Sequence, residues 1–266
     1  NIGATRLEVA GVSGLTQLSP EQFPTKEAPE GARQIFVYRF PAADYTYEVA
    51  ASRVEPEVNV SQVVVYKISA TDRVIRADVE LDIASGNAIP YVDVLGFVPE
   101  GTETKGYVVV RSRDGSPLPQ IAAKTYNLAL EGGTFGQNLK VFKSSDLIGE
   151  GGVGFIPGVR HTSSKADGFR TNFGLLHTGS GAAAKVEVMI YKADGTVAGV
   201  RTVWLDAGEF KQIDLFNLTG LTDVVTEGSV EFRVESGGPV AVYASEVDNR
   251  TQDPVLIPAV LGIGVN

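Results

Sequence analysis

The sequence predicts an all-β fold, built as two tandem antiparallel β-sandwiches of immunoglobulin-like or jelly-roll-like type, and three observations lead to it. Thirty glycines and thirteen prolines among 266 residues, with one methionine, favour short strands joined by many turns. Polar and apolar residues alternate in segments such as 185–192, which is the period of a strand with one buried face. The sequence also repeats itself once, at an offset that falls from 125 residues (Tyr66 to Tyr191) to 122 residues (Asn127 to Asn249).

The repeat sets the expected domain boundaries. Residues 108–127 align with residues 230–249, and we take two similar apolar phrases, FIPGV at 155–159 and LIPAV at 256–260, as the end of each copy. The first copy then carries extra residues before its end. The predicted organisation is an N-terminal arm or linker at 1–30, a first sandwich at 31–159 with an insertion at 139–154, and a second sandwich at 160–266 with a C-terminal strand.

Turn residues between alternating segments predict hairpins in the second sandwich. The strand at 185–192 is followed by Asp194 and Gly195, a pair typical of tight hairpin turns, and then by an apolar return strand. Gly237 and Gly238 separate the next two strand-like segments in the same way. Several such strands at a spacing of about ten residues are typical of a sandwich.

Two segments stand apart from this strand pattern. Residues 1–30 contain the proline-rich and acidic stretch SPEQFPTKEAPEG, which favours an extended arm, although the opening TRLEVAG is compatible with one strand. Residues 211–225 are the one place where we expect a helical turn or two.

Composition excludes several classes of function. The formal charge of −9 argues against a nucleic-acid partner, because phosphates require clustered lysine and arginine. The absence of cysteine excludes disulfides and thiolate metal ligands. No apolar run reaches the roughly 18 residues that a bilayer requires, so we expect no membrane insertion. The chain begins at Asn1 without a basic or apolar leader, which suits a mature secreted protein or a trimmed chain, and we expect an extracellular or cell-surface location.

The phrases FRTNFGLLHTGSGAAAKVEVMIYKADGT, LDAGEFKQIDLF and GPVAVYASEVDNRTQDPVLIPAV resemble repeats found in secreted, multidomain bacterial proteins, often beside hydrolase or adhesion-like domains. The resemblance covers about residues 66–260. It implies a β-sandwich module with an extracellular location. It transfers no catalytic residues, since the shared motifs are turns and strand ends.

Side chains that carry out catalysis are sparse. His161 and His177 have no third histidine or cysteine with which to form a metal site, and we interpret both as loop or surface residues. Asp78, Glu80 and Asp82 share one face of a strand and resemble the paired acids of a glycosidase, but a solvated polar face explains them better. Hydrolase and nucleotide-binding signatures are absent from the sequence, so we expect no enzymatic activity and no catalytic residues.

Calcium is the one cofactor that the sequence brings into consideration. The segment EVDNRTQD offers oxygen ligands from Glu246 and, above all, from Asp248, Asn249 and Asp253, and acidic loops of sandwich modules can bind calcium. The matching segment of the first copy keeps few of these groups, and Asn249 is better explained as a turn residue. We therefore expect no cofactor.

Trp204 is the one candidate for ligand contact. It is the only tryptophan, and if Val203 and Leu205 face inward it faces solvent, where an aromatic ring can stack on a sugar or contact a protein.

The C-terminal segment is the strongest candidate for a contact between subunits. PVLIPAVLGIGVN carries no charge, and a free apolar strand pairs either with its own module or, by strand exchange, with a neighbouring copy. The candidate residues for subunit contact are Val255, Leu256, Ile257, Val260, Leu261 and Ile263.

These observations favour a non-catalytic extracellular structural or interaction protein, such as a filament or surface-assembly subunit or an adhesin-like stalk. Its partner would be a second copy, another surface protein or a polysaccharide. The alternatives are a carbohydrate-binding accessory module of a secreted hydrolase, which predicts that Trp204 binds glycan, and a hydrolase with two acids in a cleft.

Overall fold

The computed structural model describes the backbone over more residues than it describes side chains. The backbone is described in residues 5–9, 33–38, 45–52, 60–69, 75–84, 88–92, 105–112, 120–128, 134–164, 166–215 and 224–262. Side chains are described in residues 106–111, 121, 123, 136–164, 166–215 and 224–262. Nearly all of these residues lie in antiparallel sheets, which confirms the predicted all-β sandwich class. No helix in these ranges is long and apolar enough to span a lipid bilayer.

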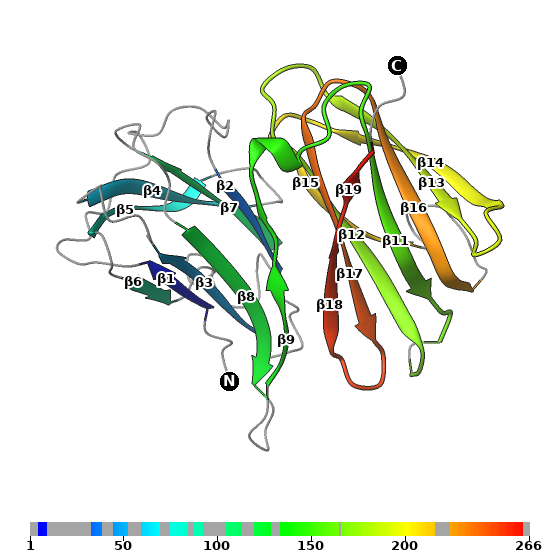
Figure 1. Cartoon of the computed structure of the whole chain (residues 1–266), viewed down its shortest axis with the longest axis horizontal. Coiled ribbons are helices and arrows are strands. Elements are labelled where there is room, and N and C mark those ends of the chain that lie inside the picture. Colours follow the sequence, from blue (N-terminus) through cyan, green and yellow to red (C-terminus); the bar gives the residue numbers. More distant parts are fainter. Residues whose placement is uncertain are drawn as a thin grey trace. The chain divides into compact units, whose positions relative to one another are not determined.

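The chain separates into two compact units, unit 1 (Asn1–Ser144) and unit 2 (Ser145–Asn266). Unit 1 contains two five-stranded sheets, with the strand orders β1-β6-β3-β8-β9 and β10-β2-β7-β4-β5 (Figure 1). The strands are β1 (Thr5–Val9), β2 (Arg33–Tyr38), β3 (Tyr45–Ser52), β4 (Val60–Ser69), β5 (Ile75–Ala84), β6 (Ala88–Val92), β7 (Lys105–Ser112), β8 (Gln120–Leu128), β9 (Thr134–Leu139) and β10 (Val141–Phe142). The segment TRLEVAG does form a strand, β1.

Unit 2 begins within a short 3-10 turn, η2 (Ser144–Asp146), and also contains two sheets. We call them the β14 sheet, with the order β14-β13-β16-β11-β19, and the β12 sheet, with the order β15-β12-β17-β18. The strands are β11 (Val153–His161), β12 (Phe169–His177), β13 (Ala184–Tyr191), β14 (Val197–Leu205), β15 (Phe210–Asp214), β16 (Val225–Ser236), β17 (Val240–Asp248), β18 (Pro254–Pro258) and β19 (Val260–Leu261).

The two units have the same strand order. Each strand of unit 2 occupies the position of the strand numbered nine lower in unit 1, and among the strands that the structure describes β1 is the one addition. The repeat in the sequence agrees with this order, because residues 108–127 contribute to β7 and β8 while residues 230–249 contribute to β16 and β17. That the units are two copies of one module stays a prediction from the sequence.

The chain divides earlier than the sequence analysis expected, at 144/145 instead of 159/160. Residues 153–159 lie in β11, which pairs with β16 of unit 2 and is the first strand of that unit. The phrase LIPAV at 256–260 lies instead in the last two strands. The two phrases match because both are short and apolar, and they do not end equivalent copies. The expected insertion at 139–154 instead contains the end of β9, the last strand of unit 1 (β10), the connection to unit 2 and the first two residues of β11.

The hairpins of unit 2 follow the turn residues. β13 pairs with β14 across a turn in which Gly195 has a positive φ of 81°. The Asp194 carboxylate accepts hydrogen bonds from the backbone N–H and the hydroxyl of Thr196, at 2.9 and 2.7 Å. These bonds hold the turn that the Asp-Gly pair predicted. Of the segment 211–225, β15 and β16 cover the ends, and residues 216–223 lie outside the described residues.

The core of unit 2 is apolar and draws on both sheets. The rings of Phe173 on β12 and Phe232 on β16 meet edge to face, with centroids 5.4 Å apart. Strand alternation supplies the rest, because every second residue of β13 is buried. The largest fully buried side chains of the described part include Phe142 of unit 1 and, in unit 2, Ile148, Ile156, Phe173, Leu175, Leu176, Ile190, Phe210 and Phe232.

Candidate functional site

Trp204 lies on the outer face of the β14 sheet. Val203 and Leu205 on either side of it are 6% and 0% exposed, whereas Trp204 is 54% exposed. The alternation that predicted an outward tryptophan therefore holds. The carbonyl oxygen of Trp204 accepts a hydrogen bond from Nζ of Lys211, at 2.6 Å, and Lys211 lies on β15 of the other sheet.

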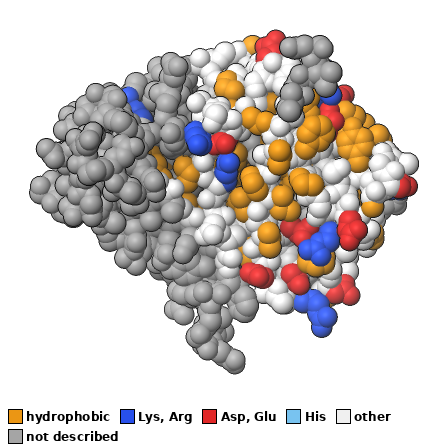
Figure 2. Space-filling model, in the orientation of Figure 1, with side chains coloured by type: hydrophobic (Ala, Val, Ile, Leu, Met, Phe, Trp, Pro, Cys, Tyr) orange, Lys and Arg blue, Asp and Glu red, His pale blue; other side chains and the backbone are white. Residues whose placement is uncertain are grey.

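A row of five residues, four of them apolar, crosses the same outer face from edge to edge. Val260 on β19 pairs with Phe155 on β11, Phe155 pairs with Glu231 on β16, Glu231 pairs with Met189 on β13, and Met189 pairs with Val200 on β14. Val260, Phe155 and Val200 are 62%, 39% and 51% exposed. We call these five residues the outer row. Figure 2 shows hydrophobic side chains over the middle of the described surface and charged side chains of both signs on its lower part. Strand register alone brings the row together, so sequence patterns did not reveal it.

The acid within the outer row is paired and covered. Glu231 is 7% exposed, and its carboxylate accepts from Nη2 of Arg233 at 2.7 Å and from the hydroxyl of Tyr191 at 3.4 Å. Desolvation, followed by the neighbouring Glu231 carboxylate, raises the pKa of Tyr191. The charge is therefore satisfied locally and leaves the row largely apolar to solvent.

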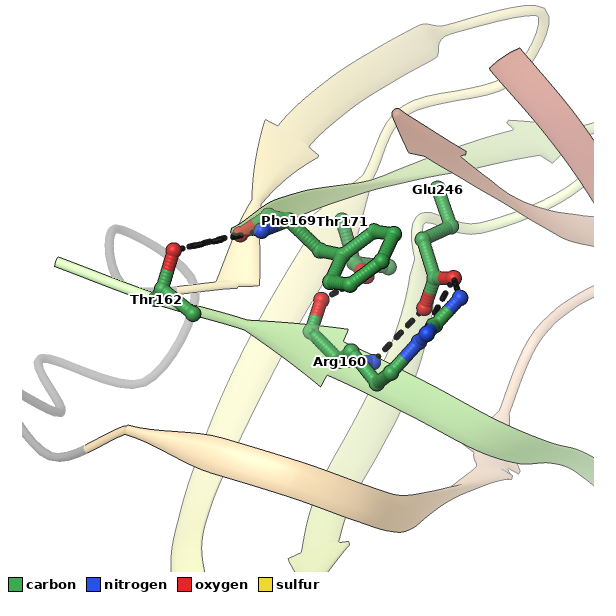
Figure 3. Close-up of polar contacts among 5 residues, drawn as sticks. All are labelled: Arg160, Thr162, Phe169, Thr171 and Glu246. Carbon is green, nitrogen blue, oxygen red and sulfur yellow. Dashed lines mark hydrogen bonds and ion pairs between the residues drawn. The ribbon is translucent and has the colours of Figure 1, made fainter. Parts of the chain in front are cut away.

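An ion pair between Arg160 and Glu246, which we call the bracket, joins the two sheets at one end of unit 2 (Figure 3). Arg160 on β11 donates from its backbone N–H to Oε2 of Glu246 at 2.8 Å, and from Nε to Oε1 at 3.0 Å, with Nη2 on the same oxygen. Glu246 lies on β17 and is 5% exposed. The guanidinium also stacks on the Phe169 ring, with Cζ 3.5 Å from its centroid. Thr171 donates its hydroxyl proton to the carbonyl of Arg160, at 2.6 Å.

We interpret the bracket as a contact that stabilises the sandwich and not as a binding site. Arg160 belongs to the β14 sheet, while Glu246 and Phe169 belong to the β12 sheet, so its bonds hold the two layers together. Both oxygens of the carboxylate and one face of the guanidinium are already engaged. Since charge-assisted bonds of this kind are strong, the bracket fixes the sandwich at this end.

Both histidines are buried, which corrects the interpretation of them as loop or surface residues. His161 ends β11 and is 6% exposed, and its Nδ1 accepts from the backbone N–H of Thr171 at 3.1 Å. His177 ends β12 and is fully buried, and neither of its ring nitrogens has a hydrogen-bond partner. The sequence analysis placed both histidines at the surface because the side chain is polar, but their positions on the strands direct both rings into the sandwich. Burial lowers the pKa of His161, and the Asp214 carboxylate opposes that shift.

The residues considered for calcium already have other partners. One oxygen of Asp248 accepts the backbone N–H groups of Arg250 and Thr251, at 2.7 and 3.2 Å. Asn249 accepts from Arg170 at 2.7 Å and donates to the carbonyls of two residues in the loop before β12. These contacts use one carboxylate oxygen of Asp248 for the turn and the side-chain oxygen of Asn249 for Arg170. Asp253 contributes its backbone carbonyl, which accepts from the N–H of Asp248. No group of three or more His, Asp or Glu in the described ranges lies close enough to hold a metal ion.

The C-terminal segment completes the sheets of its own unit. β18 pairs with β17, which places Leu256 opposite Ser245 and Ile257 opposite Ala244, and β19 pairs with β11. Each of the two strands ends its sheet, so the segment forms an edge of both layers. Val255, Val260 and Leu261 remain 56%, 62% and 39% exposed. Ile263 lies outside the described residues, and so do the side chains of Asp78, Glu80 and Asp82 on β5.

Comparisons with known proteins add little to this geometry. No protein-family model matches the chain, and no curated protein matches it. One solved structure, a glycosyl hydrolase family 2 member from Bacteroides cellulosilyticus DSM 14838, is similar over 92% of this chain and 30% of that chain. Its sequence identity is 11% and its TM-score is 0.18. This chain therefore spans less than a third of that protein's length, and the likeness is too distant to carry an argument about function.

Proposed function

We propose that this chain is a non-catalytic extracellular or cell-surface protein that works by association, as a subunit of a surface assembly or filament or as an adhesin-like stalk. The observation that carries this proposal is the C-terminal edge of unit 2. Val255, Val260 and Leu261 are exposed there, and residues 254–262 contain no charge. Exposed apolar residues on a sheet edge are a surface that another strand or another protein covers.

Two features of this edge favour association with another chain. β18 and β19 end their sheets, so both layers present backbone groups for an added strand, except at Pro254 and Pro258, which have no N–H to donate. Phe155 extends the apolar surface inward from β19, since it pairs with Val260. An added strand would thus gain backbone hydrogen bonds and apolar contact together. The chain's net charge of −9 opposes non-specific association elsewhere.

The test is negative-stain electron microscopy of the whole chain across a dilution series. The double variant Val255→Lys and Val260→Lys places charges on exposed positions, so it leaves the core unchanged. The matched control is Val224→Lys, which changes a valine that is 51% exposed and lies outside the segment. Assemblies that vanish in the double variant and persist in the control support the proposal. Single particles of the wild-type chain at every concentration overturn it.

A carbohydrate-binding role is the second candidate, because two exposed aromatic rings share one sheet face. Trp204 and Phe155 are 54% and 39% exposed, and the strand register places both on the outer face of the β14 sheet. Aromatic rings stack on the apolar faces of sugars. Retention on insoluble glycans that Trp204→Ala abolishes, and that Val200→Ala leaves intact, would favour this role. Wild-type chain that passes such a column unretained would remove it.

A further inference from the structure

The two units differ in how they protect equivalent sheet edges. β5 and β14 occupy the same terminal position in their sheets. β5 carries four charged residues among ten, at Arg76, Asp78, Glu80 and Asp82. β14 carries Arg201 alone among nine. Since charged residues on an edge strand discourage pairing with other chains, β5 has the composition of a protected edge and β14 does not.

The exposed residues of β14 are mostly apolar or uncharged. Val197, Val200 and Trp204 are all more than half exposed, and Thr202 is exposed between the last two. The strand is nine residues long, and its one strand partner in the described part is β13. Its other side therefore offers alternate backbone N–H and C=O groups to an incoming strand.

We propose that two copies of this chain pair antiparallel along their β14 edges, with Thr202 of each copy facing the other at a two-fold axis. In this register Trp204 of each copy lies opposite Val200 of the other, so the exposed apolar residues cover one another. Arg201 lies opposite Val203, which avoids the like-charge contact that a register centred on Arg201 would impose. The contact is isologous and closes as a dimer with one continuous sheet.

Self-complementarity is what identifies the second copy as the partner. The sequence from Val200 to Trp204 reads V-R-T-V-W, which places an apolar residue at each end and an uncharged residue at the centre. Lys211 lies at one end of the proposed contact, because its ammonium group donates a hydrogen bond to the carbonyl oxygen of Trp204. A carbonyl oxygen has a second lone pair, so that bond leaves room for a strand hydrogen bond. This contact is separate from the C-terminal edge and does not depend on assembly there.

The chain carries its own probes for this dimer. Trp204 is the only tryptophan, so its fluorescence emission should shift to shorter wavelength as concentration rises and Val200 of the second copy covers it. The chain has no cysteine, so Thr202→Cys introduces a single thiol. Cross-strand neighbours lie about 4.5–5.5 Å apart at Cβ, within reach of a disulfide after small adjustment. The matched control is Thr226→Cys, an exposed threonine on β16.

The experiment combines oxidative cross-linking, sedimentation and fluorescence on the full chain. We expect Thr202→Cys to cross-link at concentrations at which Thr226→Cys does not. We also expect Thr202→Glu, which places two like charges at the axis, to give monomers, while Thr226→Glu keeps the dimer. A dimer that survives Thr202→Glu overturns the β14 contact, and if Val255→Lys with Val260→Lys dissolves it, the C-terminal proposal stands. A β14 dimer that forms no larger assemblies overturns the C-terminal proposal instead.

Discussion

Arg160 holds Glu246 from two directions, because its backbone N–H and its guanidinium each donate to a different oxygen of the same buried carboxylate. The two residues are 86 positions apart in the sequence and lie on different sheets. This pair therefore links the two layers of the sandwich, together with the hydrogen bonds from Thr171 on β12 to Arg160 and His161 on β11. Because it is the charged contact among them, its loss should weaken that end of unit 2.

Removal of the guanidinium should destabilise unit 2. Arg160→Met keeps an apolar stem on the Phe169 ring but leaves the Glu246 carboxylate with the backbone donor, and we expect a loss of about 2–3 kcal/mol in the free energy of unfolding. Urea unfolding followed by Trp204 fluorescence reports on unit 2 alone, because that residue is the only tryptophan. Lys185→Met is the control. It breaks a pair with Glu235 whose side chains are 36% and 32% exposed, so it should cost less than about 0.5 kcal/mol. Equal losses in the two variants would contradict the prediction.

Unit 2 should lose stability as the solution becomes mildly acidic. Burial places the pKa of His161 in the folded state below its ordinary value of 6.5, so the unfolded chain binds the proton more readily. The contribution of His161 is fully present above pH 6.5 and is lost as pH falls below 6.5 toward the folded-state pKa. Urea midpoints at about pH 7.5 and about pH 5.5 measure the difference.

The variant His161→Gln isolates this contribution. The glutamine carbonyl can accept from the N–H of Thr171 as Nδ1 does, but it does not titrate. We therefore expect a smaller drop in the urea midpoint between the two pH values. A drop as large as that of the wild-type chain would assign the pH dependence to other groups.

Replacement of His177 by an apolar residue should stabilise unit 2. Its two ring nitrogens are buried without hydrogen-bond partners, and a buried polar group without a partner costs about 1–3 kcal/mol. His177→Leu removes both nitrogens at similar volume, so we expect unit 2 to gain about 1 kcal/mol. His161→Leu serves as the comparison, since it strands the N–H of Thr171 and should destabilise. Loss of stability in His177→Leu would show that the imidazole makes a favourable contact.

The sequence predicted the features of this fold that depend on neighbouring residues. Alternation along 185–192 and the Asp194-Gly195 turn predicted β13 and the hairpin, and alternation around Trp204 predicted its exposure. The same local reasoning placed β11 in the wrong unit, because a short apolar phrase matches many strands equally well. Only the pairing of β11 with β16 shows where it belongs.

Features that depend on strand register or on packing between sheets could not be predicted from the sequence. The outer row draws one residue from each of five strands, so no window of the sequence contains it. The Arg160–Glu246 bracket likewise joins distant positions. His161 and His177 look like surface residues by composition, yet they end strands at positions that face inward. The register of the strands within a sheet is needed to recognise the outer row, and the packing of the two sheets is needed to recognise the Arg160–Glu246 pair.

Gly174 on β12 should resist replacement by alanine for a purely steric reason. It pairs with Tyr243 on β17, and a Cβ added at Gly174 would lie 2.0 Å from Cε1 of that ring. Gly174→Ala must displace the ring, so we expect a loss of about 1–3 kcal/mol in the unfolding free energy. Gly181→Ala is the control, because a Cβ there meets nothing within 4 Å. In a Tyr243→Ala background the same Gly174→Ala change should cost almost nothing, since the clash is gone. A cost that persists in that background would mean that β12 itself, and not the ring, excludes a side chain at this position.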